Sequence, residues 1–308
     1  MNNDVAEKAV TGVKKRNTQA IKENITGYLF MAPLVLGLVI FVMYPLLECF
    51  WLSMFAIQPG LNKFVGLNNF KYAFNDPLVI TSVMNTFQMA ILNLLLTIPG
   101  AFIIASLINS CRRGKNFFKV SYYLPNVTSI IAISLLFKYI FYTSEQGIAN
   151  YLLSLFGISP VGWFSDPRWA QFTVSFMSFW QSLGSNMLIC LAGLQSINRT
   201  YYEAAEVDGA TGLKKWWYIT VPSSKPILVY LLVMVTMSAM KRFGDVWMIG
   251  GQYGSPAGVL RTIVLYMYTV NFENYNVGYA SAIAVILFLI ILILTIINTK
   301  LVRFDSDN

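Results

Sequence analysis

Six long apolar runs constrain this chain more than any other feature of its sequence. Each run has about 20 residues or more, the length that an α-helix needs to cross the hydrocarbon core of a bilayer. The runs cover residues 27–55, 84–109, 120–142, 170–197, 226–249 and 278–302. Hydrophobic residues make up 56% of the chain and charged residues only 12%, far less charge than in soluble domains. We therefore predict an all-α integral membrane protein with six transmembrane helices.

The distribution of Lys and Arg predicts how these spans are oriented, because basic residues are retained on the cytoplasmic side of a membrane. Of the 22 Lys and Arg residues, fifteen fall in the N-terminal tail, in the loops after the second and fourth runs, and at the C-terminal end. Only four fall in the other three loops. We predict a cytoplasmic tail over residues 1–26, a six-span domain over 27–302 and a cytoplasmic tail over 303–308.

The composition also argues against several functions. The chain has no histidine, which removes the usual general base and the commonest metal ligand. Its three cysteines are far apart, so neither a metal motif nor a disulfide framework is indicated. The net charge of +8 comes from basic residues between apolar runs, which is typical of membrane orientation and not of nucleic-acid binding. We expect no catalytic residue, no metal site and no nucleic-acid partner.

Ionisable residues inside the apolar runs are functional candidates, because a charge in hydrocarbon costs several kcal/mol unless it faces protein or water. They are Glu48, Lys138, Lys241, Arg242 and Asp245. The first two lie toward the outer ends of their runs, where reaching the interface explains them. Asp245 follows Lys241 by four residues and Arg242 by three, so on a continuous helix it could pair with either. A structural ion pair and the lining of a translocation path are both compatible with this spacing.

A patch of polar and aromatic side chains lies in the middle of the fourth run. It comprises Trp180, Gln181, Ser182, Ser185 and Asn186. Hydroxyl and amide groups next to an indole ring are suited to a sugar, although small polar residues also serve helix packing in membranes. Prolines inside the first three runs, Pro45, Pro99 and Pro125, are compatible with kinked helices and with broken ones.

The polar segment 201–226 separates the fourth and fifth runs, and its glycine and prolines suggest two short helices with a turn between them. It contains EAAEVDGATG over residues 203–212, followed by Ile219 and Pro222. This segment resembles the EAA motif of binding-protein-dependent ABC importer permeases. Further similarity to their carbohydrate-uptake branch, the maltose and glycerol-3-phosphate type, lies in FVGLNNF (64–70), WFSDP (163–167) and GYASA (278–282).

The resemblance implies a MetI-like permease fold and a set of partners. Those partners are a second homologous permease, two ATPase subunits and an extracytoplasmic solute-binding protein, in a bacterial or archaeal plasma membrane. The residues expected to couple to the ATPase are Glu203, Ala204, Ala205, Asp208 and Gly209. ATP and Mg are expected on the ATPase subunits, since this chain has no phosphate-binding GxxxxGK[ST] loop.

Related maltose-type permeases hold sugar with residues of the fourth and fifth spans, and the resemblance places the corresponding positions near Ser178, Gln181, Ser182, Ser185, Ser238 and Arg242. Several of these residues differ in type, so the resemblance does not identify the solute. A neutral sugar or oligosaccharide is the first expectation. Lys241 and Arg242 also allow an anionic sugar or a glycerophosphodiester, unless Asp245 cancels their field. A secondary carrier driven by an ion gradient, and a membrane scaffold with no transport path, are the alternatives from other classes.

Overall fold

A computed structural model describes residues 24–111 and 113–303 of the chain. Most of the predicted tails, residues 1–23 and 304–308, lie outside the described residues. The chain divides into two compact units, residues 1–52 and residues 53–308, and each is described by itself. Helices dominate both units, and the only strands in the described part form a small hairpin, so the predicted all-α class is confirmed.

In the first unit, residues Asn24–Leu52 form one helix that is long and apolar enough to span a membrane. The helix widens to a π-helical turn, η1 (Val39–Met43), before it continues as α2 (Tyr44–Leu52). A similar π-helical segment, η2 (Trp216–Thr220), lies in the second unit. Each ends two residues before a proline, Pro45 and Pro222. Proline has no N–H and its ring clashes with the carbonyl of the preceding turn, and a wider turn relieves both effects.

The second unit begins with the antiparallel hairpin β1 (Phe55–Gln58) and β2 (Leu61–Phe64) and then becomes helical. Its elements up to the segment after the fourth run are α3 (Asn68–Asn75), α4 (Pro77–Ser110), α5 (Lys115–Val127), α6 (Ile130–Ile140), α7 (Ile148–Ser154), α8 (Pro167–Gln195), α9 (Arg199–Val207) and α10 (Gly212–Lys215). After η2 follow α11 (Val221–Ser223), α12 (Lys225–Met240), α13 (Gly244–Gly250), α14 (Ile263–Tyr268), η3 (Thr269–Glu273) and α15 (Val277–Arg303).

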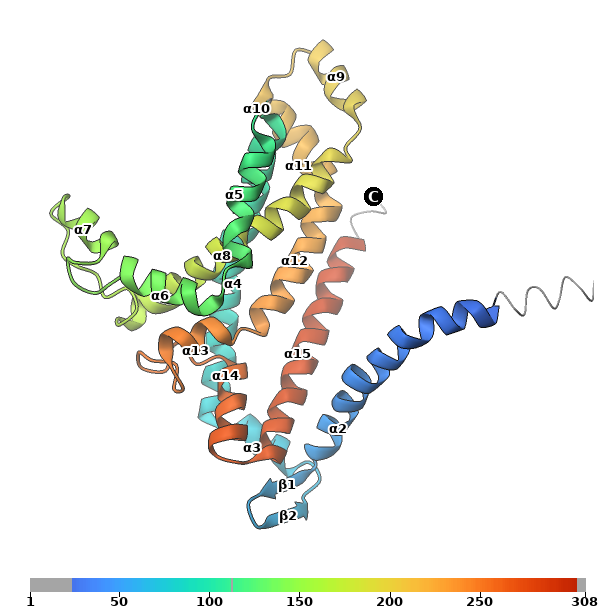
Figure 1. Cartoon of the computed structure of the whole chain (residues 1–308), viewed down its shortest axis with the longest axis vertical. Coiled ribbons are helices and arrows are strands. Elements are labelled where there is room, and N and C mark those ends of the chain that lie inside the picture. Colours follow the sequence, from blue (N-terminus) through green and yellow to red (C-terminus); the bar gives the residue numbers. More distant parts are fainter. Residues whose placement is uncertain (1–23, 112, 304–308) are drawn as a thin grey trace, which may run out of the picture. The chain divides into compact units, whose positions relative to one another are not determined.

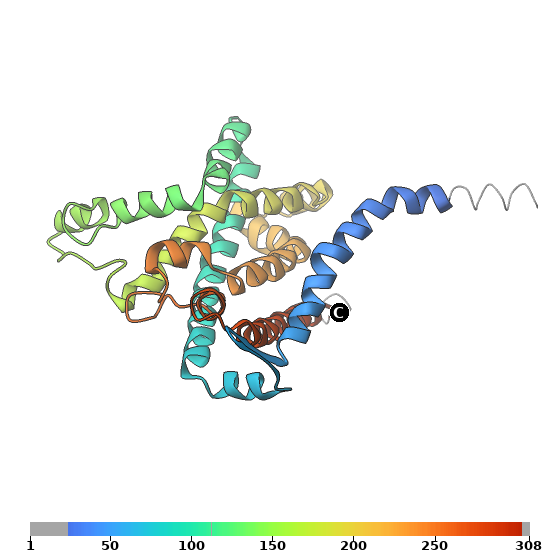
Figure 2. The same cartoon turned by 60° about the horizontal axis from the view of Figure 1, so that its bottom comes forward.

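Helix α4 is the central element of the second unit. It packs along α8 more extensively than any other pair of helices and also contacts α12 and α14. All three hydrophobic clusters of the core contain α4 residues: Ala90 in the first, Phe102 in the second and Met89 in the third. α12 and α15 lie side by side (Figures 1 and 2) and close the first cluster. The position of α4 therefore fixes where the other long helices lie.

Asp76 joins α4 to two other helices. Its carboxylate caps α4 by accepting from the backbone N–H of Leu78 at 2.8 Å. It also accepts from the hydroxyls of Tyr266 and Tyr279, each at 2.7 Å, which come from α14 and α15. Burial alone would raise the pKa of Asp76, but these hydrogen bonds to the charged form outweigh it and lower the pKa.

Two predicted spans are broken where the sequence suggested continuous runs. α5 and α6 meet at an angle of 99°, because the Ser129 hydroxyl caps a new helix by accepting from the N–H of Ile131. α12 has only 16 residues, or about 24 Å, which is less than the roughly 30 Å of a bilayer core. Residues 226–249 are thus not one helix.

Within residues 24–111 and 113–303, three single helices are long and apolar enough to cross a membrane, or up to five spans if each bent pair counts as one. The predicted fourth span corresponds to α8. This helix is 29 residues long, but because it carries the polar patch it is not apolar enough to be counted among these spans. Six spans therefore stay a prediction.

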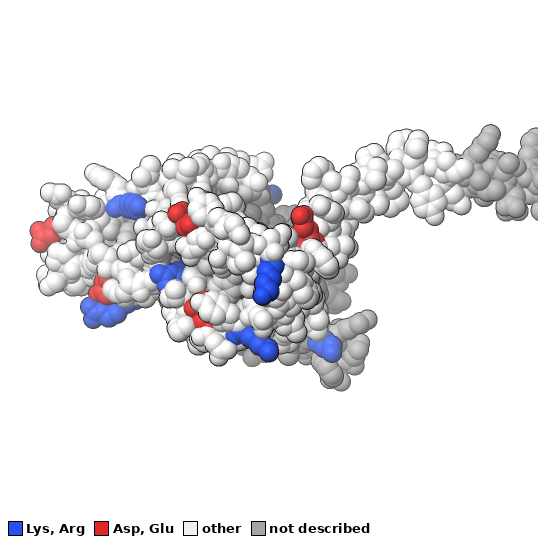
Figure 3. Space-filling model, turned by 90° about the horizontal axis from the view of Figure 1, so that it is seen from below, with Lys and Arg blue, Asp and Glu red and all other residues white. Residues whose placement is uncertain are grey.

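The two ends of the second unit differ. α9 and α10 lie at one end, and the hairpin β1–β2 with α3 lies at the other (Figure 1). Viewed from the hairpin end, charged side chains of both signs are scattered over a largely uncharged surface (Figure 3). A large field of one sign is absent from the described surface in this view.

We predict that Asp76→Asn lowers the free energy of unfolding by about 1–3 kcal/mol, because charge-assisted hydrogen bonds from Tyr266 and Tyr279 become neutral ones. The thermal unfolding of the detergent-solubilised protein measures this. Since the pKa of Asp76 is lowered, its contribution is complete at neutral pH and declines as the pH falls below the ordinary value of 3.8. The difference between wild type and variant should therefore shrink in acid; a difference that does not depend on pH would contradict the role of the charge.

Candidate functional site

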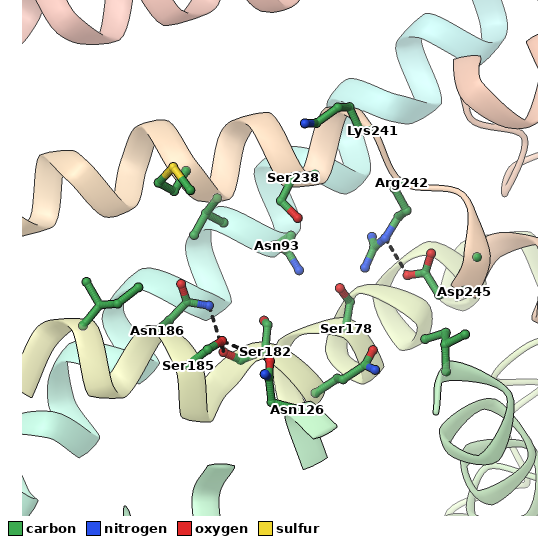
Figure 4. A pocket seen from close by; sticks show the side chains of 17 residues that line it. Asn93, Asn126, Ser178, Ser182, Ser185, Asn186, Ser238, Lys241, Arg242 and Asp245 are labelled. Atoms are coloured by element: carbon green, nitrogen blue, oxygen red, sulfur yellow. Dashed lines mark hydrogen bonds and ion pairs between the residues drawn. The ribbon is translucent and has the colours of Figure 1, made fainter. Parts of the chain in front are cut away.

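A polar cavity of about 590 Å³ lies among α4, α5, α8, α12 and the start of α13. Figure 4 shows side chains from α8 and α12 facing one another across it, with α4 behind. Its polar lining consists of Asn93, Asn126, Ser178, Gln181, Ser182, Ser185, Asn186, Ser238, Lys241, Arg242 and Asp245. Nine of the ten residues that the sequence proposed for a solute path are thus brought to one place.

The α8 side of the cavity is a ladder of hydroxyl and amide groups. Ser182, Ser185 and Asn186 share a face because of their three-and-four spacing. The Asn186 amide donates to the carbonyl of Ser182 at 2.8 Å, and the Ser185 hydroxyl is within 3.1 Å of Asn126 Oδ1 on α5. Between these residues, Gly184 lets the backbone of α5 approach closely, since a Cβ there would collide with the carbonyl of Tyr122. This stretch of α8 therefore serves both cavity lining and helix packing.

The charged side of the cavity is dominated by a buried ion pair. Arg242 Nε and Asp245 Oδ2 are 2.6 Å apart, and the two side chains are only 4% and 8% exposed. The guanidinium also donates to Ser175 Oγ at 3.2 Å and to the carbonyl of Val174 at 3.4 Å, both on α8. Each charge is thus neutralised within the chain, and the pair adds no net charge to the cavity.

The pair forms because α12 ends at Met240 and the chain turns before α13. Lys241, the C-cap of α12, is exposed, and its side chain points away from Asp245 (Figure 4). The choice between Lys241 and Arg242 that the sequence left open is therefore settled in favour of Arg242. Lys241 remains a cation at the rim of the cavity.

Trp180 does not line this cavity. Its ring packs against Phe137 of α6, with the centroids 5.5 Å apart, on the side of α8 that faces the third hydrophobic cluster. Lys138 on the same helix donates to the carbonyl of Met248 at 2.8 Å. The packing of α6 therefore holds Trp180 away from the polar groups of α8 that line the cavity.

Sequence reasoning missed two amides in the lining, Asn93 on α4 and Asn126 on α5. Asn126 is the only amide in its apolar run, whereas the run of Asn93 also contains Asn85, Gln88 and Asn109, and only ionisable residues and clusters of polar residues were singled out. An amide inside a predicted span was the available signal, because an amide in hydrocarbon needs a partner as well.

The proposed coupling residues lie on a separate, exposed segment. Glu203, Ala204 and Ala205 belong to α9, and Asp208 is its C-cap. Gly209 follows with φ = +73° and free space around it, so the backbone conformation, and not crowding, requires glycine there. α10 begins three residues later, which agrees with the predicted pair of short helices and the turn.

The carboxylates of Glu206 and Glu203 in this segment differ in their contacts. Glu206 pairs with Lys215 at 2.7 Å, which ties α9 to α10. Within residues 24–111 and 113–303, the Glu203 side chain makes no hydrogen bond or ion pair, and it is exposed. It lines a second polar cavity of about 670 Å³ that extends to the ends of α4 and α5.

Trp216 connects this segment to helix α4, and a further contact lies within the segment itself. The indole N–H of Trp216 donates to Ser106 Oγ on α4 at 3.0 Å, and the same ring packs against Phe102. The hydroxyls of Tyr202 and Thr220 are 3.0 Å apart. The segment is therefore linked to α4 by the side-chain contacts of Trp216.

Comparison with known proteins identifies the family. Residues 97–304 match the model of the binding-protein-dependent transport system inner membrane component. The chain is 34% identical over 275 residues to the arabinooligosaccharides transport system permease protein AraP of Bacillus subtilis, covering 89% of this chain and 87% of the relative. It is 31% identical to the lactose transport system permease protein LacF of Rhizobium radiobacter, covering 89% of this chain and 93% of the relative.

A solved structure has the same fold. It is a chain of a bacterial alginate ABC transporter in complex with an alginate pentasaccharide-bound periplasmic protein, with a TM-score of 0.81 and 22% sequence identity over 94% of this chain and 97% of that one. The chain described here thus belongs to the family of binding-protein-dependent transport system inner membrane components and is a membrane permease subunit. The resemblance of its EAA segment to this family is confirmed.

We predict that Arg242→Gln lowers the free energy of unfolding by about 3–5 kcal/mol, because it leaves the Asp245 carboxylate buried and unpaired. The double variant Arg242→Met/Asp245→Asn should recover most of this loss, since it removes both charges. Thermal unfolding of the solubilised protein measures both. Lys241→Gln is the matched control: it removes the adjacent, exposed charge and should change the stability by less than about 0.5 kcal/mol. Equal losses for Lys241→Gln and Arg242→Gln would contradict the importance of burial.

Proposed function

We propose that this chain is the membrane-spanning subunit of an ATP-driven importer and forms half of the translocation path for a neutral sugar or oligosaccharide. The observation that carries the proposal is the cavity between α8 and α12, which offers hydroxyls and amides, whose buried charges cancel, and which has the unpaired Lys241 only at its rim. Such groups recognise the oxygens of a sugar ring. The named substrates of AraP and LacF, arabinooligosaccharides and lactose, are of this class.

The proposed assembly contains a second homologous permease, two ATPase subunits and an extracytoplasmic solute-binding protein. The periplasmic protein in the alginate transporter complex supports the last of these partners. α9 would dock on an ATPase subunit, which supplies ATP and Mg. Its exposed face suits a protein partner, since Ala204 allows close approach and Val207 is 89% exposed. This chain would do no chemistry itself.

The proposed orientation places both termini and the α9–α10 end in the cytoplasm of a bacterium or archaeon. The excess of Lys and Arg in the tail and in the loops at this end supports it. ATP binding would favour an outward-facing cavity and hydrolysis would reset it. The movement would pass from α9 through Trp216 to α4, and through the chain itself to α8 and α12.

An anionic solute is the second candidate, favoured by the unpaired Lys241 at the rim of the cavity. The alginate in the structural relative is an acidic polysaccharide. An ion-coupled carrier has less support, because Asp245, the carboxylate that it would use in the cavity, is engaged by Arg242.

Uptake by the reconstituted complex tests the proposed function. We expect ATP-dependent import into proteoliposomes of at least one neutral compound from a panel of arabinotriose, lactose and maltose, in preference to sn-glycerol 3-phosphate and an alginate oligosaccharide. Import of the anionic compounds alone would favour the second candidate. Import that follows an ion gradient and does not need ATP would contradict an ATP-driven importer.

Glu203→Lys tests the docking of α9. We expect a loss of about tenfold or more in ATP-driven uptake and in co-purification of the ATPase subunits, because the variant replaces an exposed carboxylate that would meet a basic partner. Glu206→Gln is the matched control on the same helix: it breaks an exposed ion pair within the chain, which contributes little, and should leave the assembly intact. Survival of both uptake and co-purification in Glu203→Lys would rule out docking through this residue.

A further inference from the structure

Asn93 is a buried amide in the middle of α4 whose N–H donors have no acceptor among the described residues. Its side chain lines the cavity, where Figure 4 shows it between Ser238 of α12 and the polar face of α8. The residue is 6% exposed. Among the described residues, its Nδ2 makes no hydrogen bond, whereas its Oδ1 is 3.5 Å from the Thr97 hydroxyl, the donor of that contact.

An unsatisfied amide is unfavourable at this position. The two N–H groups of the amide lose their hydrogen bonds to water when they are buried. A leucine at the same position has no polar group and would not have this cost. A residue that destabilises the empty protein is explained if its donors are used in another state. The direction of the side chain indicates that the partner would enter the cavity.

The surroundings of Asn93 define what that partner can be. Ser238 and Asn186 lie on the facing helices (Figure 4) and offer a hydroxyl and an amide. Arg242 and Asp245, which line the same cavity, are paired with each other at 2.6 Å, and Lys241 lies exposed at its rim. An N–H donor among neutral groups is matched by a hydroxyl or ring oxygen, and a cavity of about 590 Å³ is in the usual range for small-molecule sites.

We propose that Asn93 is a specificity-determining residue of the solute site and that its Nδ2–H donates to an oxygen of a neutral, polyhydroxylated solute. The proposal rests on the proposed function and deepens it. It adds α4 to α8 and α12 as a wall of the site. Because α4 also bears Ser106, which accepts from Trp216 of the exposed segment, one helix touches both the solute and the coupling segment.

Asn93→Leu in the reconstituted complex tests this proposal. The uptake of the neutral panel compound that wild type imports fastest should fall about 3–10-fold at equal amounts of assembled complex, the effect of losing about one neutral hydrogen bond. The melting temperature of the solute-free protein should stay the same or rise, because the unsatisfied donors are gone. Asn93→Gln, which keeps the donors, should retain more of the uptake than Asn93→Leu does.

Ser82→Ala is the matched control. Ser82 is also a buried α4 residue whose hydroxyl makes no hydrogen bond among the described residues, but it does not line the cavity. Uptake by the complex that carries Ser82→Ala should equal uptake by wild type.

Three results would overturn the proposal. Wild-type uptake in Asn93→Leu would show that the amide does not touch the solute. A parallel loss of uptake and melting temperature would assign Asn93 a structural role. Import by wild type of only the anionic compounds would exclude the neutral class. Failure of the proposed function is distinct from these, since wild type would then show no ATP-driven uptake at all, and the inference would fall with it.

Discussion

The buried ion pair between Arg242 and Asp245 is the interaction on which the membrane part of this protein depends most. A charge pair that is less than a tenth exposed is stable only when its geometry is good and its remaining hydrogen-bonding groups are satisfied. Here α8 supplies the additional acceptors, and Thr262 donates to the carbonyl of Arg242 at 2.9 Å. The pair and the Arg242 backbone therefore connect the chain just after α12, the start of α13, the first half of α8 and the beginning of α14.

The same pair explains the character of the cavity. It lies just beyond the early end of α12, beside the polar space between α12 and α8, and because its charges cancel, hydroxyls and amides are the main groups left available to a solute. An electrically neutral lining is compatible with a neutral sugar and gives little attraction to an anion, apart from the exposed Lys241 at the rim. Charge cancellation, more than the number of polar groups, is what sets the expected class of solute.

Helix α4 gives the second organising principle. It contributes to all three hydrophobic clusters, it is anchored at one end by Asp76 and contacted near the other by Trp216, and Asn93 lies between these points. Asn93 and the Trp216 contact lie on the same continuous helix, on either side of Pro99, so one element reaches both the cavity and the exposed segment. The proposed coupling would therefore use side-chain contacts on α4 in addition to the covalent connection to α8 and α12.

The sequence by itself determined the class of the protein. The length and spacing of the apolar runs predicted an all-helical membrane protein, since the hydrocarbon core requires such runs, and the motif at Glu203 indicated the permease family. The polar residues of α8 could be grouped because helical periodicity is local. Only the tertiary structure decided which residues meet across helices: that Asp245 pairs with Arg242 and not with Lys241, that Trp180 turns toward α6, and that Asn93 enters the cavity. Those outcomes depend on where a helix stops and what packs against it, which are properties of the whole fold.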